Sequence, residues 1–430
     1  MVSLDHAQRG GALWHATRSE KEGAIAATNL FEQTYHYTPE GVWAAPGRVN
    51  LIGEHVDYAG GICLPFALTQ CAYVAVSRNN DGVYRAIDDA GGGQVFEIPV
   101  SEVGPGSPNN WTGYVLGAIW AAGQAGLLGP GDSGEENAAM QGFDLALTSD
   151  VPIGAGLSSS AAIECSAAVA AVEITHGRSV NEVERVALVD ATMRAENEVV
   201  GAATGGLDQK ISLLGWKGNA LAIDFGTGAY RQVPFNIEKK GLSILVANTN
   251  SPHSLADGQY ASRRGVIDGV AEAAGKSTLR MVTNPYETAQ AWAVSHTPEG
   301  VDTQEWVEIV HRRVRHVVSE IARTEKAIAQ LEAGDLKAFG ESMQLSHISL
   351  RHDYEVSTPE LDTVVEIALA HGALGARMTG GGFGGSAIAL LPSERLKECA
   401  DAIAEAFNQR GYPVPEFIAA TPSQGAHRVK

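Results

Sequence analysis

Two carboxylates and one imidazole stand within four positions of the chain, at Glu54, His55 and Asp57. An apolar run precedes them and a glycine pair follows them, which predicts a polar cleft at the end of a buried strand. An acidic turn without such flanks would be typical of a solvated loop. Carboxylates and an imidazole supply the acceptors and the donor that neutral sugar hydroxyls require. Arg48, just upstream, adds a planar guanidinium that can bind a phosphate or a developing anion.

A glycine- and serine-rich segment at residues 151–174 could hold a phosphate. Gly154 and Gly156 allow close backbone approach, and the helix expected after them presents unpaired N–H groups at the positive end of its dipole. No Lys follows the last glycine, so the segment is not a Walker A loop. A turn with a serine cap needs one hydroxyl, whereas residues 158–160 supply three, one of which could ligate a divalent cation.

Acidic side chains also flank a second glycine pair. Glu196 and Glu198 lie near the end of an expected helix, and Asp208 follows Gly205 and Gly206 closely. In so cramped a loop Asp208 could act as a general base or orient a substrate hydroxyl. The alternative is an aspartate that caps the next helix.

The densest glycine cluster occupies residues 380–385, between two apolar runs. Such density indicates positive φ or close backbone approach at several positions. A tight hairpin would explain it as well as a ligand loop does, so this cluster alone decides nothing.

The chain has 430 residues and a formal net charge of −19. This length exceeds that at which one hydrophobic core usually keeps growing, so we expect two domains. Nucleic acids and anionic membranes are polyanions, and the charge therefore argues against both as partners. An anionic ligand must be bound by local donors.

Cysteine usage and hydropathy indicate a reducing compartment. None of the cysteines forms a CxxC pair, and we expect buried, reduced thiols at Cys63, Cys71, Cys165 and Cys399. The first residues show no basic start followed by an apolar core, and no apolar run is long enough to cross a bilayer. We therefore expect a cytoplasmic protein.

Periodicity and turn residues predict the elements that must position these groups. Helices are expected at 19–38, 110–127, 159–176, 180–200 and 393–411, with further helices over 255–371 apart from a loop at 283–304. Strands are expected at 41–53, 64–78, 83–88, 93–99, 142–152, 220–225 and 242–248, and in two runs around the glycines of 380–385. A boundary near residue 235 gives domains 1–235 and 236–430.

Taken together, these stretches resemble the galactokinases, members of the GHMP family of small-molecule kinases. GRVNLIGEHVDYAGG at residues 47–61 is similar to the family's sugar signature. GAGLSSSAA and GARMTGGGFGG look like its second and third motifs, in the expected order. The resemblance spans roughly residues 25–415.

The resemblance implies transfer of the γ-phosphoryl group of ATP to the 1-hydroxyl of α-D-galactose, giving galactose 1-phosphate and ADP, with Mg²⁺ as cofactor. It implies that Asp208 and Arg48 are catalytic. The family's sugar-binding positions match Arg48, Glu54, His55, Asp57, Gly205, Asp208 and Tyr260. Its phosphate loop matches Gly154, Ala155, Gly156, Leu157, Ser158, Ser159 and Ser160. Its magnesium ligands match Ser160 and Glu196, the latter preferred to Glu198 for its spacing to Asp208.

The implied architecture is an α+β fold of two domains with the active site between them. The N-terminal domain has a mixed sheet under helices, and the C-terminal domain has an antiparallel sheet with helices. We expect a monomer whose partners are galactose and ATP.

Two other functions stay open. One is a related sugar kinase that acts on N-acetylgalactosamine or arabinose, because Val56 and Ala59 replace the signature's Thr and Asn beside the expected sugar contacts. The other is a non-catalytic galactose and ATP sensor. Such sensors can lack residues just after the serine run, but here Ala161 follows Ser160 directly and Asp208 is present, which favours the enzyme.

Overall fold

The computed structural model describes residues 11–129, 141–202, 204–251 and 256–430. The expectation that the first residues hold no secretion signal falls on residues 1–10, which lie outside this part. In the described residues the strands form three sheets. The largest is mixed, in the order β14-β2-β4-β7-β5-β6, with β5 and β7 parallel and the other neighbours antiparallel. Its strands are β2 (Gly41–Asn50), β4 (Pro65–Asn79), β5 (Val83–Asp88), β6 (Phe96–Pro99), β7 (Gly142–Ser149) and β14 (His427–Arg428).

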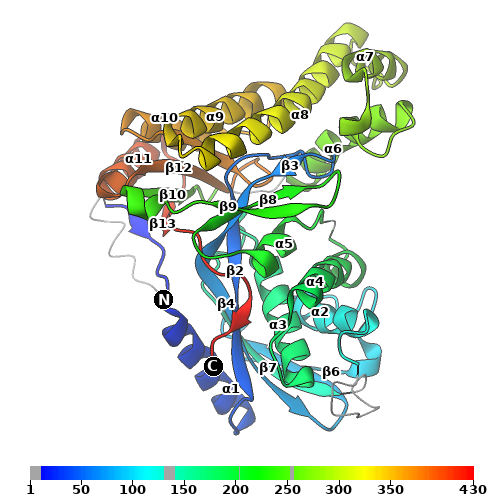
Figure 1. The fold of residues 1–430 in the computed structure, drawn as a ribbon, viewed down its shortest axis with the longest axis vertical. Helices are drawn as coiled ribbons and strands as arrows, with labels where there is room; N and C mark the ends of the chain where they lie inside the picture. Colours follow the sequence, from blue (N-terminus) through cyan, green and yellow to red (C-terminus); the bar gives the residue numbers. More distant parts are fainter. Residues whose placement is uncertain (1–10, 130–140, 203, 252–255) are drawn as a thin grey trace.

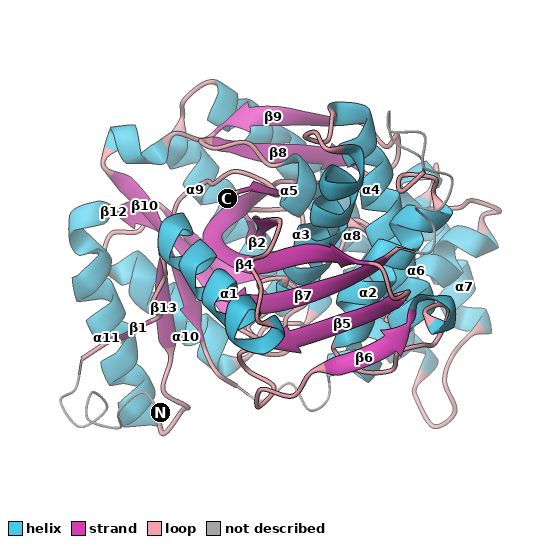
Figure 2. Cartoon of the chain, turned by 90° about the horizontal axis from the view of Figure 1, so that it is seen from below, coloured by secondary structure: helices cyan, strands magenta, loops and turns pink. Residues whose placement is uncertain are grey.

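Both faces of this sheet are covered by helices. Successive side chains of a strand point to opposite faces, so Val42 and Ala44 pack with α1 while Trp43 and Ala45 join the larger core on the other side. Figure 2 shows α1 (Glu20–Tyr35) lying across β4 and β7. On the second face α3 (Ser159–His176) packs against β2 and β4, and α2 (Thr112–Gln124) and α4 (Glu182–Arg194) pack against α3. Ser19 caps α1, and it forms a capping box with Glu22.

The second sheet is antiparallel apart from one edge pair. Its order is β1-β13-β10-β12-β11, and β1 pairs with β13 in parallel. Its strands are β1 (Leu13–Trp14), β10 (Leu242–Asn248), β11 (Gly375–Thr379), β12 (Ser386–Pro392) and β13 (Glu416–Ala420). Helices pack against this sheet and one another, and in Figure 1 α8, α9 and α10 lie across its top. These helices are α6 (Ala256–Ala273), α7 (Pro285–Ser295), α8 (Thr303–Glu332), α9 (Leu336–Ser349), α10 (Pro359–Ala370) and α11 (Leu396–Arg410).

Smaller elements join the two parts. The third sheet has the order β3-β8-β9, formed by β3 (Ile62–Cys63), β8 (Asn219–Asp224) and β9 (Tyr230–Pro234). It leads from α5 (Leu207–Leu214) into β10. Short 3₁₀ helices occupy Val100–Glu102, Ile237–Lys240, Leu279–Met281 and Ser393–Arg395, and π-helical segments occupy Ala195–Val200 and Leu350–Tyr354.

Each of the two large sheets contains one short strand from the opposite part of the chain. Strand β1, from the N-terminal part, completes the sheet built mainly from residues after 241, while β14 covers the outer edge of β2 in the mixed sheet. The predicted pair of a mixed and an antiparallel sheet is confirmed. The exchange of short end strands was not predicted.

Two other expectations can be compared with the structure. The prediction of a loop at 283–304 was wrong in part, because α7 fills the first half of this range. The helix starts with Pro285, and a proline is tolerated in the first turn because its missing N–H would have no partner within the helix there. The four cysteines are free and buried, as expected. No helix in the described part of the chain is both long and apolar enough to cross a membrane.

Candidate active site between the two large sheets

The regular pairing of β2 with β4 is interrupted directly before Arg48. Pairing of β2 with β4 shifts register between Pro46 and Arg48, where Gly47 of β2 stands opposite the three unpaired residues 68–70 of β4. A Cβ on Gly47 would lie 2.5 Å from the Leu157 carbonyl oxygen, so only glycine fits here. The Arg48 backbone N–H then donates to the same carbonyl at 3.0 Å. Bulges of this kind often redirect a side chain next to an active site.

The turn after β2 points its polar side chains in one direction. His55 has φ 60°, a conformation that few non-glycine residues adopt. Glu54 is 4% exposed and accepts hydrogen bonds from Thr379 Oγ1 at 3.2 Å and from the Gly380 N–H at 2.6 Å. The first signature and the third glycine motif therefore meet at one carboxylate.

Val56 and Ala59 lie on the opposite side of this turn. Both are fully buried in the apolar cluster that includes Leu279 and Ile321, and neither lines the polar pocket. The expectation that these two substitutions remove polar groups beside the sugar was wrong, because both positions face the apolar cluster and not the pocket.

A pocket of about 200 Å³ collects the predicted sugar-binding residues. Its wall comes from β2, the turn after it, the loop before α5, the first turns of α6 and the glycine loop after β11. The residues lining it are Arg48, Asn50, Gly53, Glu54, His55, Asp57, Thr204, Gly205, Leu207, Asp208, Tyr260, Gly380 and Gly381. All seven residues predicted to contact the sugar are among them.

Arg48 and Asp208 form a two-bond ion pair in this pocket. The Arg48 Nε donates to Asp208 Oδ1 at 2.8 Å, and Nη2 donates to Oδ2 at 3.1 Å. The remaining nitrogen, Nη1, donates to the Gly156 carbonyl at 2.5 Å. Asp208 lies in the first turn of α5, which begins after Gly206 at φ 82°. The guanidinium thus joins the polar pocket to the glycine and serine loop.

His55 is held as a neutral ring. Its Nε2 lies 3.0 Å from the Gly381 carbonyl, so this nitrogen carries the proton and donates. Its Nδ1 accepts from the Tyr58 hydroxyl at 3.1 Å, and that hydroxyl lies 2.7 Å from the Tyr354 hydroxyl. Burial, helped by the nearby His316, lowers the pKa of His55 to about 3. The Tyr260 ring packs beside it, with centroids 5.3 Å apart.

Asp57 is the titratable acceptor of the pocket. Burial, aided by the negative charge of Asp208, raises the pKa of Asp57 to about 6. Gly205 leaves room for this carboxylate, because a Cβ there would lie 2.6 Å from Asp57 Oδ2. The side chain is therefore ionised at neutral pH and faces the space beside Asp208.

The glycine and serine loop has the backbone of an anion cradle. Gly154 and Gly156 have φ values of 75° and 70°, and Ser158 adopts φ 62° just before α3 begins. The Ser158 hydroxyl is buried and has no hydrogen-bond partner among the described residues. The Ser386 hydroxyl of β12 donates to the Ala155 carbonyl at 2.7 Å, so a strand of the second sheet holds the backbone of this loop in place.

A cluster of carboxylates lies behind the first turn of α3. The Gln209 amide donates to Glu196 Oε2 at 2.5 Å and to Glu164 Oε2 at 3.1 Å. Burial and the Asp208 charge raise the pKa of Glu196 to about 7, against hydrogen bonds from Gln209 and Ser160 that lower it. Glu196 is 9% exposed and lies in a π-helical segment, a distortion common at functional sites.

Glu196, rather than Glu198, faces Ser160. Glu198 lies outside, in an exposed ion pair with Arg194 at 2.9 Å. The sequence preference for Glu196 thus agrees with the direction of the two side chains.

Several pocket residues were not predicted. Asn50, Thr204 and Leu207 sit between predicted residues, but nothing in their types distinguishes them from ordinary strand and loop residues. Gly380 and Gly381 belong to the glycine cluster that the sequence singled out, and that cluster was the available signal. Their backbone groups, not side chains, contact Glu54 and His55.

Comparison with known proteins identifies the family. The galactokinase galactose-binding signature matches residues 29–78, the GHMP kinase N-terminal domain matches 114–216 and the GHMP kinase C-terminal domain matches 327–409. A galactokinase of Streptomyces coelicolor is 42% identical over 409 residues, covering 94% of this chain and 99% of that protein. The chain belongs to the galactokinase family. By family, it is therefore an ATP-dependent sugar kinase.

Further relatives agree with this assignment. A galactokinase of Mycobacterium tuberculosis is 37% identical over 384 residues, covering 89% of this chain and 98% of that protein. The crystal structure of a Lactococcus lactis galactokinase complexed with galactose superposes with a TM-score of 0.79 at 31% identity, covering 94% of this chain and 99% of that one. A mevalonate kinase, with a TM-score of 0.58 at 18% identity, shares the fold. The predicted GHMP kinase fold is confirmed.

Proposed function

We propose that this galactokinase-family protein transfers the γ-phosphoryl group of ATP to the 1-hydroxyl of α-D-galactose, giving galactose 1-phosphate and ADP. One observation carries the proposal. The ion pair between Arg48 and Asp208 lies where the polar pocket meets the phosphate loop, with one Arg48 nitrogen on the Gly156 carbonyl. A hydroxyl held beside Asp208 would therefore face a phosphate held by the loop.

Asp208 and Arg48 are the proposed catalytic residues. Phosphoryl transfer needs in-line placement and neutralisation of charge that spreads over the transferring group. Asp208 accepts a hydrogen bond from the sugar hydroxyl and orients or deprotonates it. Arg48 supplies fixed positive charge next to the phosphate loop, in a chain whose net charge is −19.

Glu54, His55, Asp57, Gly205 and Tyr260 are proposed to surround the sugar. Asp57 and Glu54 supply carboxylate acceptors for hydroxyl groups. Both His55 nitrogens bond to the protein, so we assign to this ring, together with Tyr260, the role of a wall that shapes the pocket. Gly205 keeps the Asp57 carboxylate accessible.

The loop from Gly154 to Ser160 is proposed to bind the ATP phosphates, with Ser160 and Glu196 as ligands of Mg²⁺. The donor set fits this ion, because hydroxyl and carboxylate oxygens are hard ligands, and the buried Glu164 Oε1 beside Glu196 has no hydrogen-bond partner among the described residues. Mg²⁺ usually takes one or two carboxylates and completes its shell with water and phosphate. When bound, it neutralises charge on the phosphates.

The remaining proposals concern organisation. We propose domains at 1–235 and 236–430, supported by the separate sheets on either side of residue 235, with the short end strands exchanged. The monomeric state and the cytoplasmic location stay predictions. Light scattering after size exclusion checks the oligomeric state.

A coupled assay of ADP release across free monosaccharides tests the function. We expect turnover with galactose, and much less with N-acetylgalactosamine, arabinose and glucose. Asp208→Asn should lower kcat by a factor on the order of 10²–10⁴ while galactose still binds in calorimetry. Galactose binding without turnover in the unmodified protein would indicate the sensor instead, and a stronger response to another sugar would reassign the substrate.

A metal titration tests the Mg²⁺ ligands. Glu196→Gln should raise the Mg²⁺ concentration needed for half-maximal activity and weaken Mg²⁺-dependent ATP binding in calorimetry. Glu198→Gln, two residues away and exposed, is the matched control and should change neither. Equal behaviour of the two variants would remove Glu196 from the metal site.

A further inference from the structure

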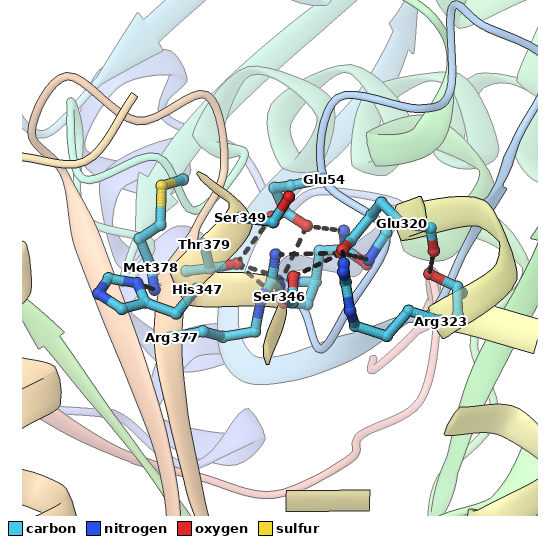
Figure 3. A network of polar contacts seen from close by, with 12 residues as sticks. Glu54, Glu320, Arg323, Ser346, His347, Ser349, Arg377, Met378 and Thr379 are labelled. Atoms are coloured by element: carbon cyan, nitrogen blue, oxygen red, sulfur yellow. Dashed lines mark hydrogen bonds and ion pairs between the residues drawn. The ribbon is translucent and has the colours of Figure 1, made fainter. Parts of the chain in front are cut away.

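Glu54 is held by donors from both halves of the molecule. Its Oε1 accepts from Thr379 and Gly380, as described above, and its Oε2 accepts from Arg377 Nη1 at 3.1 Å and from the Asn50 amide. Figure 3 shows this network from close by. Asn50 belongs to β2, whereas the other donors come from β11 and the loop after it. The orientation of this carboxylate thus depends on the second sheet.

Arg377 is the charged member of that donor set. Its side chain is 0% exposed, and it lies behind Glu54 and outside the pocket lining. Nη1 also donates to the Asn50 carbonyl at 3.2 Å, which fixes the end of β2. A single guanidinium therefore sets both the carboxylate and the strand from which the signature turn begins.

A second buried carboxylate lies on the far side of Arg377. Glu320 of α8 is 0% exposed, and its Oε1 is 3.9 Å from Arg377 Nη2. Glu320 is itself bonded to the Gly53 N–H at 3.0 Å and paired with Arg323. Two buried carboxylates and two guanidiniums balance one another, so Arg377 is shared between Glu54 and Glu320 (Figure 3).

Removing Arg377 would change the chemical state of Glu54. Burial raises the pKa of Glu54, and the Arg377 charge is the strongest influence against that rise. Without this charge the carboxyl would take up a proton at higher pH and turn from acceptor to donor. Lysine at the same position would keep the charge but offers a point charge in place of a fork that bonds two acceptors.

We propose that Arg377 is a positioning residue for the sugar: it fixes the Glu54 carboxylate as an acceptor in the pocket, and thereby governs affinity for galactose but not for ATP. The proposal rests on the proposed function, because Glu54 must contact the sugar for Arg377 to act through it. Arg377 itself touches neither substrate.

Steady-state kinetics of Arg377→Lys and Arg377→Met test this role. We expect the methionine variant to raise the KM for galactose by roughly 10- to 100-fold, the lysine variant to raise it less, and both to leave the KM for ATP within about twofold. The acidic limb of kcat/KM for galactose against pH should move to higher pH in Arg377→Met. A residue that only stabilises the fold would move none of these selectively.

Three further variants separate the outcomes. Arg85→Lys alters another ion-paired arginine, on β5 away from the pocket, and should leave both KM values unchanged. If Arg377→Met does not fold, Arg377→Lys is measured in its place. The double variant Arg377→Met with Glu320→Gln is measured as well, because it removes one buried positive and one buried negative charge and so keeps the charge balance. Glu54→Gln should raise the KM for galactose by itself.

Each result either supports or overturns the proposal. Parallel changes in both KM values, or a loss of thermal stability with unchanged KM values and an unshifted pH limb, would overturn it. If Glu54→Gln raises the KM for galactose but the Arg377 variants do not, the role of Arg377 is overturned while the proposed function stands. No turnover of galactose by the unmodified protein would instead overturn the function itself.

Discussion

Replacing Asp57 by asparagine should stabilise the free protein while it weakens galactose binding. Burial and the neighbouring Asp208 raise the pKa of Asp57 from 3.8 to about 6. Because the folded pKa lies above the unfolded one, the ionised side chain destabilises the fold at pH values above 6. This destabilisation fades as the pH falls through 6 and towards 3.8.

The size of the effect follows from that shift. About 2 pKa units correspond to roughly 3 kcal/mol in the free energy of unfolding at pH 8. For a chain of 430 residues, with an unfolding entropy on the order of 0.9 kcal/mol per kelvin, the melting temperature should rise by about 3 °C. At pH 5 about half of the gain should remain. Loss of a charged hydrogen bond to the sugar should raise the KM for galactose by roughly 10- to 100-fold.

Calorimetric melting without ligand at pH 8 and pH 5, with galactose kinetics at pH 8, measures both effects. In the unmodified protein, kcat/KM for galactose should also fall below pH 6, where Asp57 takes up a proton. Asp190→Asn, an exposed aspartate on α4, is the control and should shift neither quantity. An Asp57→Asn protein that melts below the unmodified one at pH 8, or a gain that does not shrink at pH 5, would refute the burial argument. An unchanged KM would remove Asp57 from the sugar site.

Two further substitutions test the backbone around the site. Gly205→Ala should raise the KM for galactose, because the new Cβ would lie 2.6 Å from Asp57 Oδ2, whereas Gly265→Ala, with open space around its Cβ, should leave activity unchanged. Ser386→Ala should raise the KM for ATP by roughly tenfold, because the Ala155 carbonyl loses its donor at 2.7 Å, while calorimetric affinity for galactose stays the same. Equal effects of the two glycine variants, or an ATP KM unaffected by Ser386→Ala, would contradict these readings.

Local sequence signals predicted the parts of the fold that depend on near neighbours. Helix α3 begins and ends at the residues that its periodicity predicts, and α1 begins one residue after its predicted start. The chemistry of the pocket was also readable, because carboxylates, a guanidinium and positive-φ glycines cluster in short segments. A motif carries its own turn geometry, so its residues can be recognised without the rest of the chain.

The remaining features depend on contacts between distant segments. Nothing in the sequence around Arg377 or Glu320 indicates that these two residues meet behind Glu54, because they belong to β11 and α8. The direction of Val56 depends on the apolar residues that pack against the signature turn, such as Leu279 and Ile321, which lie more than 200 residues along the chain. Strands as short as β1 and β14 have no period to detect, since each spans two residues.

The exchange of short end strands between the two large sheets has a consequence for biosynthesis. Strand β2 carries Arg48 and leads into the sugar signature, and it emerges from the ribosome early. Its outer edge is covered by β14, with Arg428 paired to Trp43, so the edge stays open until almost all of the described chain has been made. An unpaired strand edge is a template for association with other chains. Nascent and truncated forms of this protein should therefore need chaperone protection at the strand that bears the catalytic arginine.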